Sequence, residues 1–310
     1  QRYTHTLVPM KPAIYVYRGL GASEQGLSML LNALKRWCCM STYDVIQISP
    51  QEIITGEWCK NASLLAIGGG YDRGFIKALG PTGMHIIKQY VQSGGRYLGI
   101  CAGGYFGSQE IQFDKDGPLQ VCGERDLGFY QGLCVGPAYG TPPYKYNSEQ
   151  GAQAACIKWN TLGHKSNSTP INISPNHNAE KESTSVNGGK TVFNYFNGGG
   201  FFTCNDGCHR DIDSYYSNKD CSITTLATYM DLPETPAAIV KCSLNKGICI
   251  LTGIHFEYLV EKLNLEDSDL KNVIPKLQSS VREREECFRF IMDQLGITCK
   301  SCKTHETSHL

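Results

Sequence analysis

Hydrophobic positions in the first third of the chain alternate between short continuous runs and helical spacing. The runs predict strands at 13–17, 43–49, 63–67 and 96–100, and the first of them, AIYVY, has the pattern of a buried strand. Leucines at 27, 30, 31 and 34 follow one face of a helix, with Ser23 as its N-cap. A second helix is expected at 81–93, with Pro81 near its first turn. This alternation predicts a mostly parallel sheet with helices on both faces and sites beyond the strands' carboxyl ends.

The second half of the chain carries many strand-like runs separated by Gly and Pro. They lie at 119–123, 128–136, 152–159, 191–200, 223–230, 237–243 and 247–253. We interpret them as antiparallel hairpins that continue the sheet. The polar stretch 160–190 is expected to be a surface insertion.

Two helices are predicted after the last strand, near 256–264 and 278–295, followed by a tail of linker character. We therefore divide the chain into a domain at 1–265 and a C-terminal helix and linker at 266–310. No internal repeat is visible.

Composition narrows the function classes. Hydrophobic residues make up 41% of the 310 residues, which allows a sizeable core. Lys plus Arg number 29 and Asp plus Glu number 29, so no basic surplus indicates nucleic acid as a partner. No apolar stretch reaches the roughly 18 residues of a membrane span. The chain begins with Gln rather than Met and has no apolar leader, so we expect a cytoplasmic fragment of a longer protein.

The 15 cysteines allow two interpretations. A secreted disulfide scaffold is one alternative. However, several cysteines, such as Cys242 and Cys249, lie in strand-like apolar runs, where Cys behaves as a small core residue. We favour free thiols in a reducing compartment. Cys204, Cys208 and His209, and separately Cys299 with Cys302, have metal-like spacing but lack the second half of a zinc site, so no metal is expected.

The segment 98–107, LGICAGGYFG, carries the most specific chemical signal. It follows a predicted strand and places Cys101 between small residues, which is the pattern of a nucleophile elbow. The N-terminus of the helix that follows would favour a thiolate. A buried Cys in a Gly-rich turn is the structural alternative.

Two further pieces complete a thiol site. His255 and Glu257 follow the strand-like run 247–252, and residues i and i+2 of an extended stretch point the same way. Glu257 is therefore expected to orient His255 as the base for Cys101. Backbone N–H groups of Gly69, Gly70 and Ala102 are candidates for an oxyanion hole, although a Gly-rich βα turn is the simpler interpretation of the glycines.

These residues bring out a resemblance. Cys101, His255 and Glu257, in that order, resemble the triad of class I glutamine amidotransferases. Between about residues 13 and 260, the chain is similar to the N-terminal domain of eukaryotic biotin–protein ligases. The matching segments are AIGGGYDRGF, GICAGGYFGS, GERDLGFYQG, GPAYG, YNSEQGAQA, YFNGGGFF and GIHFE. The chain departs from the family at Phe256, where Pro is usual.

The resemblance implies a flavodoxin-like α/β sandwich of the class I glutamine amidotransferase-like type, with a mostly parallel central sheet and antiparallel additions. It also implies pocket positions, which are Tyr71, Gly103, Tyr195 and Asn197. Arg125 and Asp126 are interpreted as an ion pair rather than as substrate contacts.

The implied role is that of an accessory or regulatory domain with a Cys-His-Glu triad. Its partners would be a ligase catalytic domain in the same chain and carboxylases that accept biotin. ATP and biotin would serve that ligase domain, because no GRGR-type adenylate loop occurs here and no cofactor is expected in this stretch. The alternative is a stand-alone thiol amidase or glutaminase-type hydrolase acting on a small molecule.

Overall fold

A computed structural model describes residues 10–159, 189–204, 212 and 221–301. The insertion predicted at 160–190 falls almost wholly outside these residues, as do Cys208, His209 and Cys302.

The N-terminal half forms the parallel part of one large sheet, as the hydrophobic pattern predicts. Neighbouring strands run in the order β2-β1-β3-β4-β13, and every pair is parallel. The strands are β1 (Ala13–Tyr17), β2 (Asp44–Ile48), β3 (Ala62–Ile67), β4 (Arg96–Ile100) and β13 (Gly247–Thr252). The last strand of the chain thus lies beside β4, so their carboxyl ends meet at one edge of the sheet.

The antiparallel additions continue from β13 through β12, β10, β7, β5 and β6, and only β5 and β7 pair in parallel. Their bounds are β12 (Ala237–Leu244), β10 (Phe201–Thr203), β7 (Tyr130–Gly136), β5 (Ser108–Phe113) and β6 (Val121–Glu124). A branch leaves β12 through β11 (Cys221–Tyr229), β8 (Gln153–Trp159) and β9 (Lys190–Phe196). This sheet confirms the predicted fold class. The strands β5 and β10 were not predicted.

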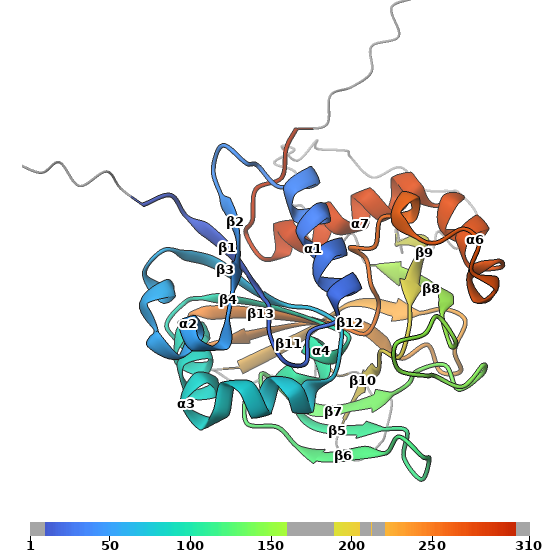
Figure 1. Ribbon diagram of the computed structural model, residues 1–310, viewed down its shortest axis with the longest axis horizontal. Coiled ribbons are helices and arrows are strands. Elements are labelled where there is room, and N and C mark those ends of the chain that lie inside the picture. The colour runs from blue at the N-terminus through green and yellow to red at the C-terminus, as the bar shows by residue number, and fades with distance from the viewer. Residues whose placement is uncertain (1–9, 160–188, 205–211, 213–220, 302–310) are drawn as a thin grey trace, which may run out of the picture.

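Helices cover both faces of the parallel part (Figure 1). On one face lie α1 (Glu24–Trp37) and α7 (Val281–Gln294), whose Trp37 and Phe288 rings are 4.6 Å apart. On the other lie α2 (Pro50–Thr55) and α3 (Asp72–Gln92). The N-cap prediction for α1 is confirmed, because the Ser23 side chain accepts a hydrogen bond from the Gly26 N–H. The shorter elements are η1 (Glu57–Lys60), α4 (Ala102–Gly107), η2 (Val260–Lys262), η3 (Ser268–Leu270) and α6 (Ile274–Gln278).

Two predicted helices differ in the structure. The prediction of a helix near 256–264 is wrong, since only the short 3₁₀ turn η2 forms there. The helix expected at 81–93 is present, but α3 begins earlier, at Asp72. Gly80, with φ 59° and ψ −176°, breaks the helix into two segments, and Pro81 starts the second. Pro81 cannot donate to the preceding turn, which explains the kink at this point.

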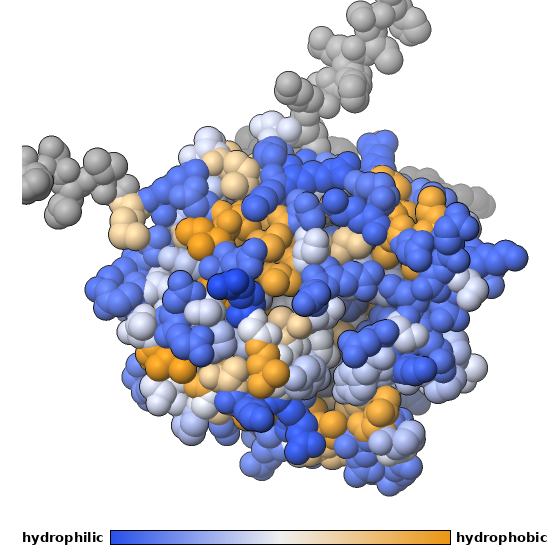
Figure 2. All heavy atoms as spheres, in the orientation of Figure 1, coloured by the Kyte–Doolittle hydropathy of each residue, from blue (hydrophilic) through white to orange (hydrophobic). Residues whose placement is uncertain are grey.

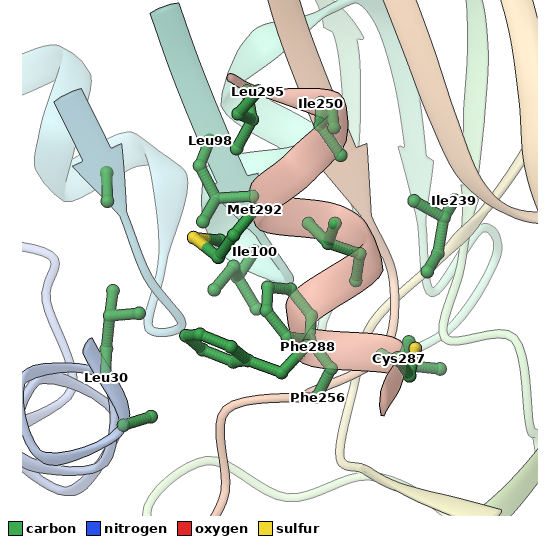
Figure 3. Packing of buried hydrophobic residues seen from close by; sticks show 14 of the residues in the cluster. Leu30, Leu98, Ile100, Ile239, Ile250, Phe256, Cys287, Phe288, Met292 and Leu295 are labelled. Atoms are coloured by element: carbon green, nitrogen blue, oxygen red, sulfur yellow. The ribbon is translucent and has the colours of Figure 1, made fainter. Parts of the chain in front are cut away.

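The core on the α1 and α7 face joins the C-terminal helix to the central strands. Figure 3 shows Phe288 and Met292 of α7, and Leu295 just after it, packed toward Leu98 and Ile100 of β4. These side chains are fully buried. The 266–310 segment is therefore in part a component of the main core.

The surface is mostly polar on the face shown in Figure 2, where hydrophobic residues gather only in small separate patches. Among the described helices, none combines the length and the hydropathy that a membrane span requires.

Candidate active site at the Cys101 elbow

Cys101 lies where β4 turns sharply into α4. Its φ of 53° and ψ of −107° lie outside the regions that non-glycine residues normally occupy. Two contacts hold this conformation. The Cys101 N–H donates to the Thr252 carbonyl at 2.8 Å, and the Cys101 carbonyl accepts from the Tyr105 N–H at 3.0 Å. Gly103 allows the close passage beneath the turn, because a Cβ there would lie 2.0 Å from the Ile67 carbonyl oxygen.

His255 and Glu257 follow β13, the strand beside β4. The backbone N–H of His255 donates to the Tyr195 carbonyl at 2.7 Å, which joins this segment to β9. Phe256 points into the core, where its ring centroid is 5.6 Å from that of Phe288 (Figure 3). Its neighbours on either side therefore share the opposite face. There His255 Nδ1 and Glu257 Oε1 are 2.7 Å apart, and both side chains are buried.

The electrostatics of the pair favour a charged imidazole. Burial alone would lower the pKa of His255, but the Glu257 carboxylate and hydrogen bonding with the Cys101 sulfur outweigh it. Together they raise the pKa of His255 to about 10. The raised pKa favours the protonated imidazole, which lies beside the Cys101 side chain. A nearby imidazolium stabilises negative charge on a cysteine.

Gly69 gives the imidazole its place next to Cys101. A Cβ on Gly69 would lie 2.8 Å from His255 Cε1 and 3.8 Å from Cys101 Cβ. Only a residue without a side chain leaves His255 where it is.

The three predicted oxyanion donors also gather at this point. Gly69 and Gly70 line a cavity beside Cys101, and Ala102 lines a smaller one next to it. The flanking bonds, from the Tyr71 N–H to the Gly21 carbonyl and from the Ser23 N–H to the Gly69 carbonyl, do not use these donors. Among the described residues, none of the backbone hydrogen bonds of turns and loops uses the three N–H groups.

The larger cavity measures about 660 Å³ and reaches Cys101 and His255. Of the pocket residues implied by the resemblance, Tyr71, Tyr195 and Asn197 line it. Gly103 does not line it, and lies beneath the elbow against β3. The Asn197 carbonyl lies 3.6 Å from the Cys101 sulfur.

Many residues that line this cavity were not predicted from the sequence. The missed residues include Glu24, Gln25, Tyr144, Tyr146, Ser148, Glu149, Tyr258 and Asp267. Glu149 holds two sides of the cavity together, since it accepts from the Tyr195 hydroxyl and, at 3.1 Å, from Gln25 Nε2. It lies in the YNSEQGAQA segment, which the resemblance singled out without a role.

Arg125 forms a buried ion pair, but its partner is Asp72 rather than Asp126. Arg125 Nε and Asp72 Oδ2 are 2.6 Å apart, and both side chains are less than a tenth exposed. The Asp126 carbonyl instead accepts from Lys88 Nζ at 3.1 Å. In the described part of the chain, no group of three or more His, Cys, Asp or Glu residues has the arrangement of a metal site.

Comparison with known proteins gives consistent matches. The family described as biotin-protein ligase, N terminal, matches residues 12–310. An uncharacterized protein of Chlamydia muridarum is 30% identical over 286 residues, which covers 91% of this chain and 94% of that protein. The biotin–protein ligase of Schizosaccharomyces pombe is 32% identical over 250 residues, covering 80% of this chain. This chain spans only 34% of the yeast enzyme.

Among solved structures, a glutamine amidotransferase of Thermotoga maritima aligns over 92% of this chain and 96% of its own, with a TM-score of 0.43 and 12% identity. A ThuA-like protein of Bacteroides uniformis aligns over 88% of this chain and 93% of its own, with a TM-score of 0.41 and 10% identity.

The family match extends over nearly the whole length that contains the elbow, the His255 segment and α7. The chain therefore belongs to the family of biotin–protein ligase N-terminal domains.

Proposed function

We propose that this chain is an accessory, regulatory domain of a biotin–protein ligase and that its Cys101 centre hydrolyses a small amide. The observation that carries the catalytic part is the alignment of three features at one edge of the sheet. These are a cysteine on a strained elbow, a buried His255–Glu257 pair beside it, and the backbone of Gly69 and Gly70 at the same cavity. A nucleophile, a base with its orienter, and oxyanion donors are the parts of a thiol hydrolase.

In this proposal, the Cys101 thiolate attacks the amide carbonyl carbon, and a carbon–sulfur bond forms. The N–H groups of Gly69, Gly70 and Ala102 bind the resulting oxyanion. His255 gives its proton to the leaving nitrogen as the carbon–nitrogen bond breaks. Neutral His255 then takes a proton from water, which attacks the thioester and releases a carboxylic acid and the thiolate. Glu257 keeps the imidazole in the orientation that these transfers need.

The charge of the cavity supports a particular class of amide. Glu24, Glu149 and Asp267 contribute carboxyl groups to the lining, and no Lys or Arg is among the described lining residues. Several tyrosine rings accompany them, and aromatic faces attract cations. We infer that the substrate carries an ammonium group. Free glutamine should then be hydrolysed faster than N-acetylglutamine, and Glu149→Gln should reduce that preference. Equal rates for both amides would contradict the inferred charge and leave the hydrolase proposal standing.

Labelling of thiols tests the nucleophile. The folded chain is treated with an iodoacetamide probe at neutral pH, and the rate of labelling is followed for each cysteine by peptide mass spectrometry. Cys101 is 7% exposed, whereas Cys122 is exposed on β6. We expect Cys101 to react about tenfold faster than Cys122 despite its burial, because an activated thiolate outweighs the loss of access.

Two controls sharpen this test. His255→Gln should slow labelling of Cys101 by about 10²-fold and leave Cys122 unchanged. Cys39 serves as an internal standard, because hydrogen bonds from Ser41 and Thr42 lower its pKa to about 7. A wild-type Cys101 that reacts no faster than Cys122, or a Cys101 rate that His255→Gln leaves unchanged, would overturn the catalytic role.

The regulatory role rests on the family and is tested in the complete protein that carries this sequence. Biotin transfer to a carboxylase acceptor is compared for that protein, for a form without residues 1–310, and for Cys101→Ala. If Cys101→Ala reproduces the deletion, regulation acts through the Cys101 chemistry. If only the deletion changes transfer, the domain acts as a binding module. Transfer that neither change affects would contradict the role.

A second candidate is a stand-alone thiol amidase. The Chlamydia relative favours it, because this chain covers 94% of that protein and leaves little room for a ligase region there. Hydrolysis of small amides by the purified chain, together with biotin transfer that neither the deletion nor Cys101→Ala affects, would support this candidate over the first. The matched Cys101→Ser variant should abolish the activity.

A further inference from the structure

Cys38 and Cys299 meet in a short antiparallel bridge far from the elbow along the chain. Cys38 follows the last residue of α1, and Cys299 lies in the segment that follows α7 (Figure 1). The Cys39 N–H donates to the Thr298 carbonyl at 3.0 Å, and the Lys300 N–H donates to the Trp37 carbonyl at 2.8 Å. The hydrogen bonds on either side are thus made by the neighbours of the two cysteines.

This pattern defines a non-hydrogen-bonded pair, in which the Cα atoms are about 4.5 Å apart and the side chains approach closely. Disulfides need Cα separations of about 4.4–6.8 Å. The backbone therefore already has the spacing that a bond between the two sulfurs requires. We propose that Cys38 and Cys299 are a redox-active dithiol that closes to a disulfide on exposure to a low-molecular-weight disulfide such as oxidised glutathione.

The environment gives the two thiols different roles. Cys38 is fully buried, while Cys299 is partly exposed and lines an open cavity of about 590 Å³ with Trp159 and Arg289. The hydrogen bond from the Cys38 thiol, helped by the Arg289 guanidinium, holds the pKa of Cys299 below its usual value. The same hydrogen bond and burial raise the pKa of Cys38. Cys299 is therefore the attacking thiolate, and Cys38 the second thiol.

The exchange balances with glutathione as the oxidant. The Cys299 thiolate attacks one sulfur of oxidised glutathione, whose sulfur–sulfur bond breaks and releases one glutathione thiolate. That thiolate takes the proton of Cys38. The Cys38 sulfur then attacks Cys299 in the mixed disulfide and releases the second glutathione. Two electrons pass from the protein thiols to the oxidant, giving one protein disulfide and two molecules of reduced glutathione.

The expected physical effect is stabilisation of the folded chain. The bond would close a loop from residue 38 to residue 299, and a cross-link across a long loop removes the most conformational entropy from the unfolded chain. We expect the midpoint of thermal unfolding to rise by about 5 °C on oxidation. The bond lies away from Cys101, so the labelling rate of Cys101 should be the same in both forms, and this inference is independent of the proposed hydrolase.

The experiment equilibrates the full chain in mixtures of oxidised and reduced glutathione. Digestion without reduction, followed by mass spectrometry, should show a Cys38–Cys299 linkage that reducing agent removes. Cys38→Ser and Cys299→Ser should each abolish both the linkage and the rise in the unfolding midpoint. Cys39→Ser and Cys302→Ser are matched controls that should keep both, and circular dichroism of the reduced proteins verifies that every variant folds.

A linkage of Cys299 to Cys302 or to Cys39 would overturn the assignment, as would the absence of any linkage across the glutathione mixtures. A midpoint that still rises in Cys38→Ser would also overturn it, because the stabilisation would then arise elsewhere.

Discussion

At the residue scale, the site depends on the side chains of His255, Phe256 and Glu257 pointing alternately to opposite faces of the chain. Phe256 is buried against α7, so His255 and Glu257 are held on the opposite face by the packing of the residue between them. Phe256 therefore anchors the loop through its ring. Arg284 of α7, also buried, donates to the Tyr258 carbonyl and fastens the same loop.

The raised pKa of His255 makes stability depend on pH in a defined direction. The folded-state pKa of about 10 lies above the ordinary value of 6.5, so protonated His255 stabilises the fold fully below about pH 6.5. That contribution is lost as the pH rises through about 10. We expect the difference in unfolding free energy between the wild type and His255→Gln to shrink from pH 6 to pH 10, as measured by urea denaturation.

The control for that measurement is His85→Gln, on the exposed side of α3. It should stay within about 0.5 kcal/mol of the wild type throughout. A His255→Gln difference that is constant with pH, or that grows toward pH 10, would contradict the assigned protonation state.

At the scale of elements, the turn after β3 determines the position of the His255 imidazole. Substitution of its two adjacent glycines, Gly68 and Gly69, distinguishes an effect on the imidazole from a general effect on the turn. A Cβ at Gly69 would meet His255 Cε1 at 2.8 Å, whereas one at Gly68 would meet Leu30 Cδ2 at an ordinary 3.7 Å. We expect Gly69→Ala to slow iodoacetamide labelling of Cys101 by about 10²-fold, because displacement of a catalytic group by about 1 Å has effects of that size. Gly68→Ala should stay close to the wild type. Equal rates for the two variants would show that His255 does not activate Cys101.

The ion pair between Asp72 and Arg125 ties the start of α3 to the segment after β6. Because both side chains are buried, removal of one partner leaves the other charge uncompensated, which costs about 3–5 kcal/mol. We expect Asp72→Asn to lower the unfolding free energy by an amount of that order. The exposed ion pair of Glu57 and Lys60 provides the comparison. Glu57→Gln should change the unfolding free energy by less than about 0.5 kcal/mol. Similar losses for both variants would refute a structural role of the buried pair.

Elements with a regular pattern were predictable, and those that depend on distant contacts were not. The strands β1 and β3 and the helix α1 carry regular apolar spacing, so their positions follow from the sequence. The first half of α3 was missed, because Gly74, Gly80 and Pro81 interrupt its pattern. The helix expected near 256–264 fails for another reason: Tyr258, Leu259 and Val260 are consecutive and all buried, which a helix packed on one side does not allow.

The candidate site also has residues that the sequence pattern predicts and residues that it does not. The positions of Cys101, His255 and Glu257 follow from where strands end, which the pattern reveals. The roles of Tyr144 and Glu149 do not, because they lie in a loop that reaches the cavity only through tertiary contacts with β9 and α1.

At the scale of the whole molecule, the C-terminal helix belongs to the core that supports the site. Phe288 and Met292 of α7 are fully buried in the cluster that also holds Ile100, the residue before Cys101. Each large apolar side chain contributes about 2–3 kcal/mol when fully buried, and domains are stable by only about 5–15 kcal/mol. Loss of α7 would thus remove most of the net stability and expose the face of β4 that leads into the elbow.

Two truncations that look similar in the sequence should therefore behave differently. A chain ending at 265 loses α6 and α7, and we expect it to be insoluble or to lack a cooperative thermal transition. A chain ending at 301 keeps every contact of α7 described above, so it should unfold within a few degrees of the full chain and label Cys101 at the same rate. Differential scanning calorimetry and the iodoacetamide assay measure both. A cooperatively folded 1–265 chain with a reactive Cys101 would show that α7 is an appendage, and the site would then be supported by the sheet, α1 and α3 alone.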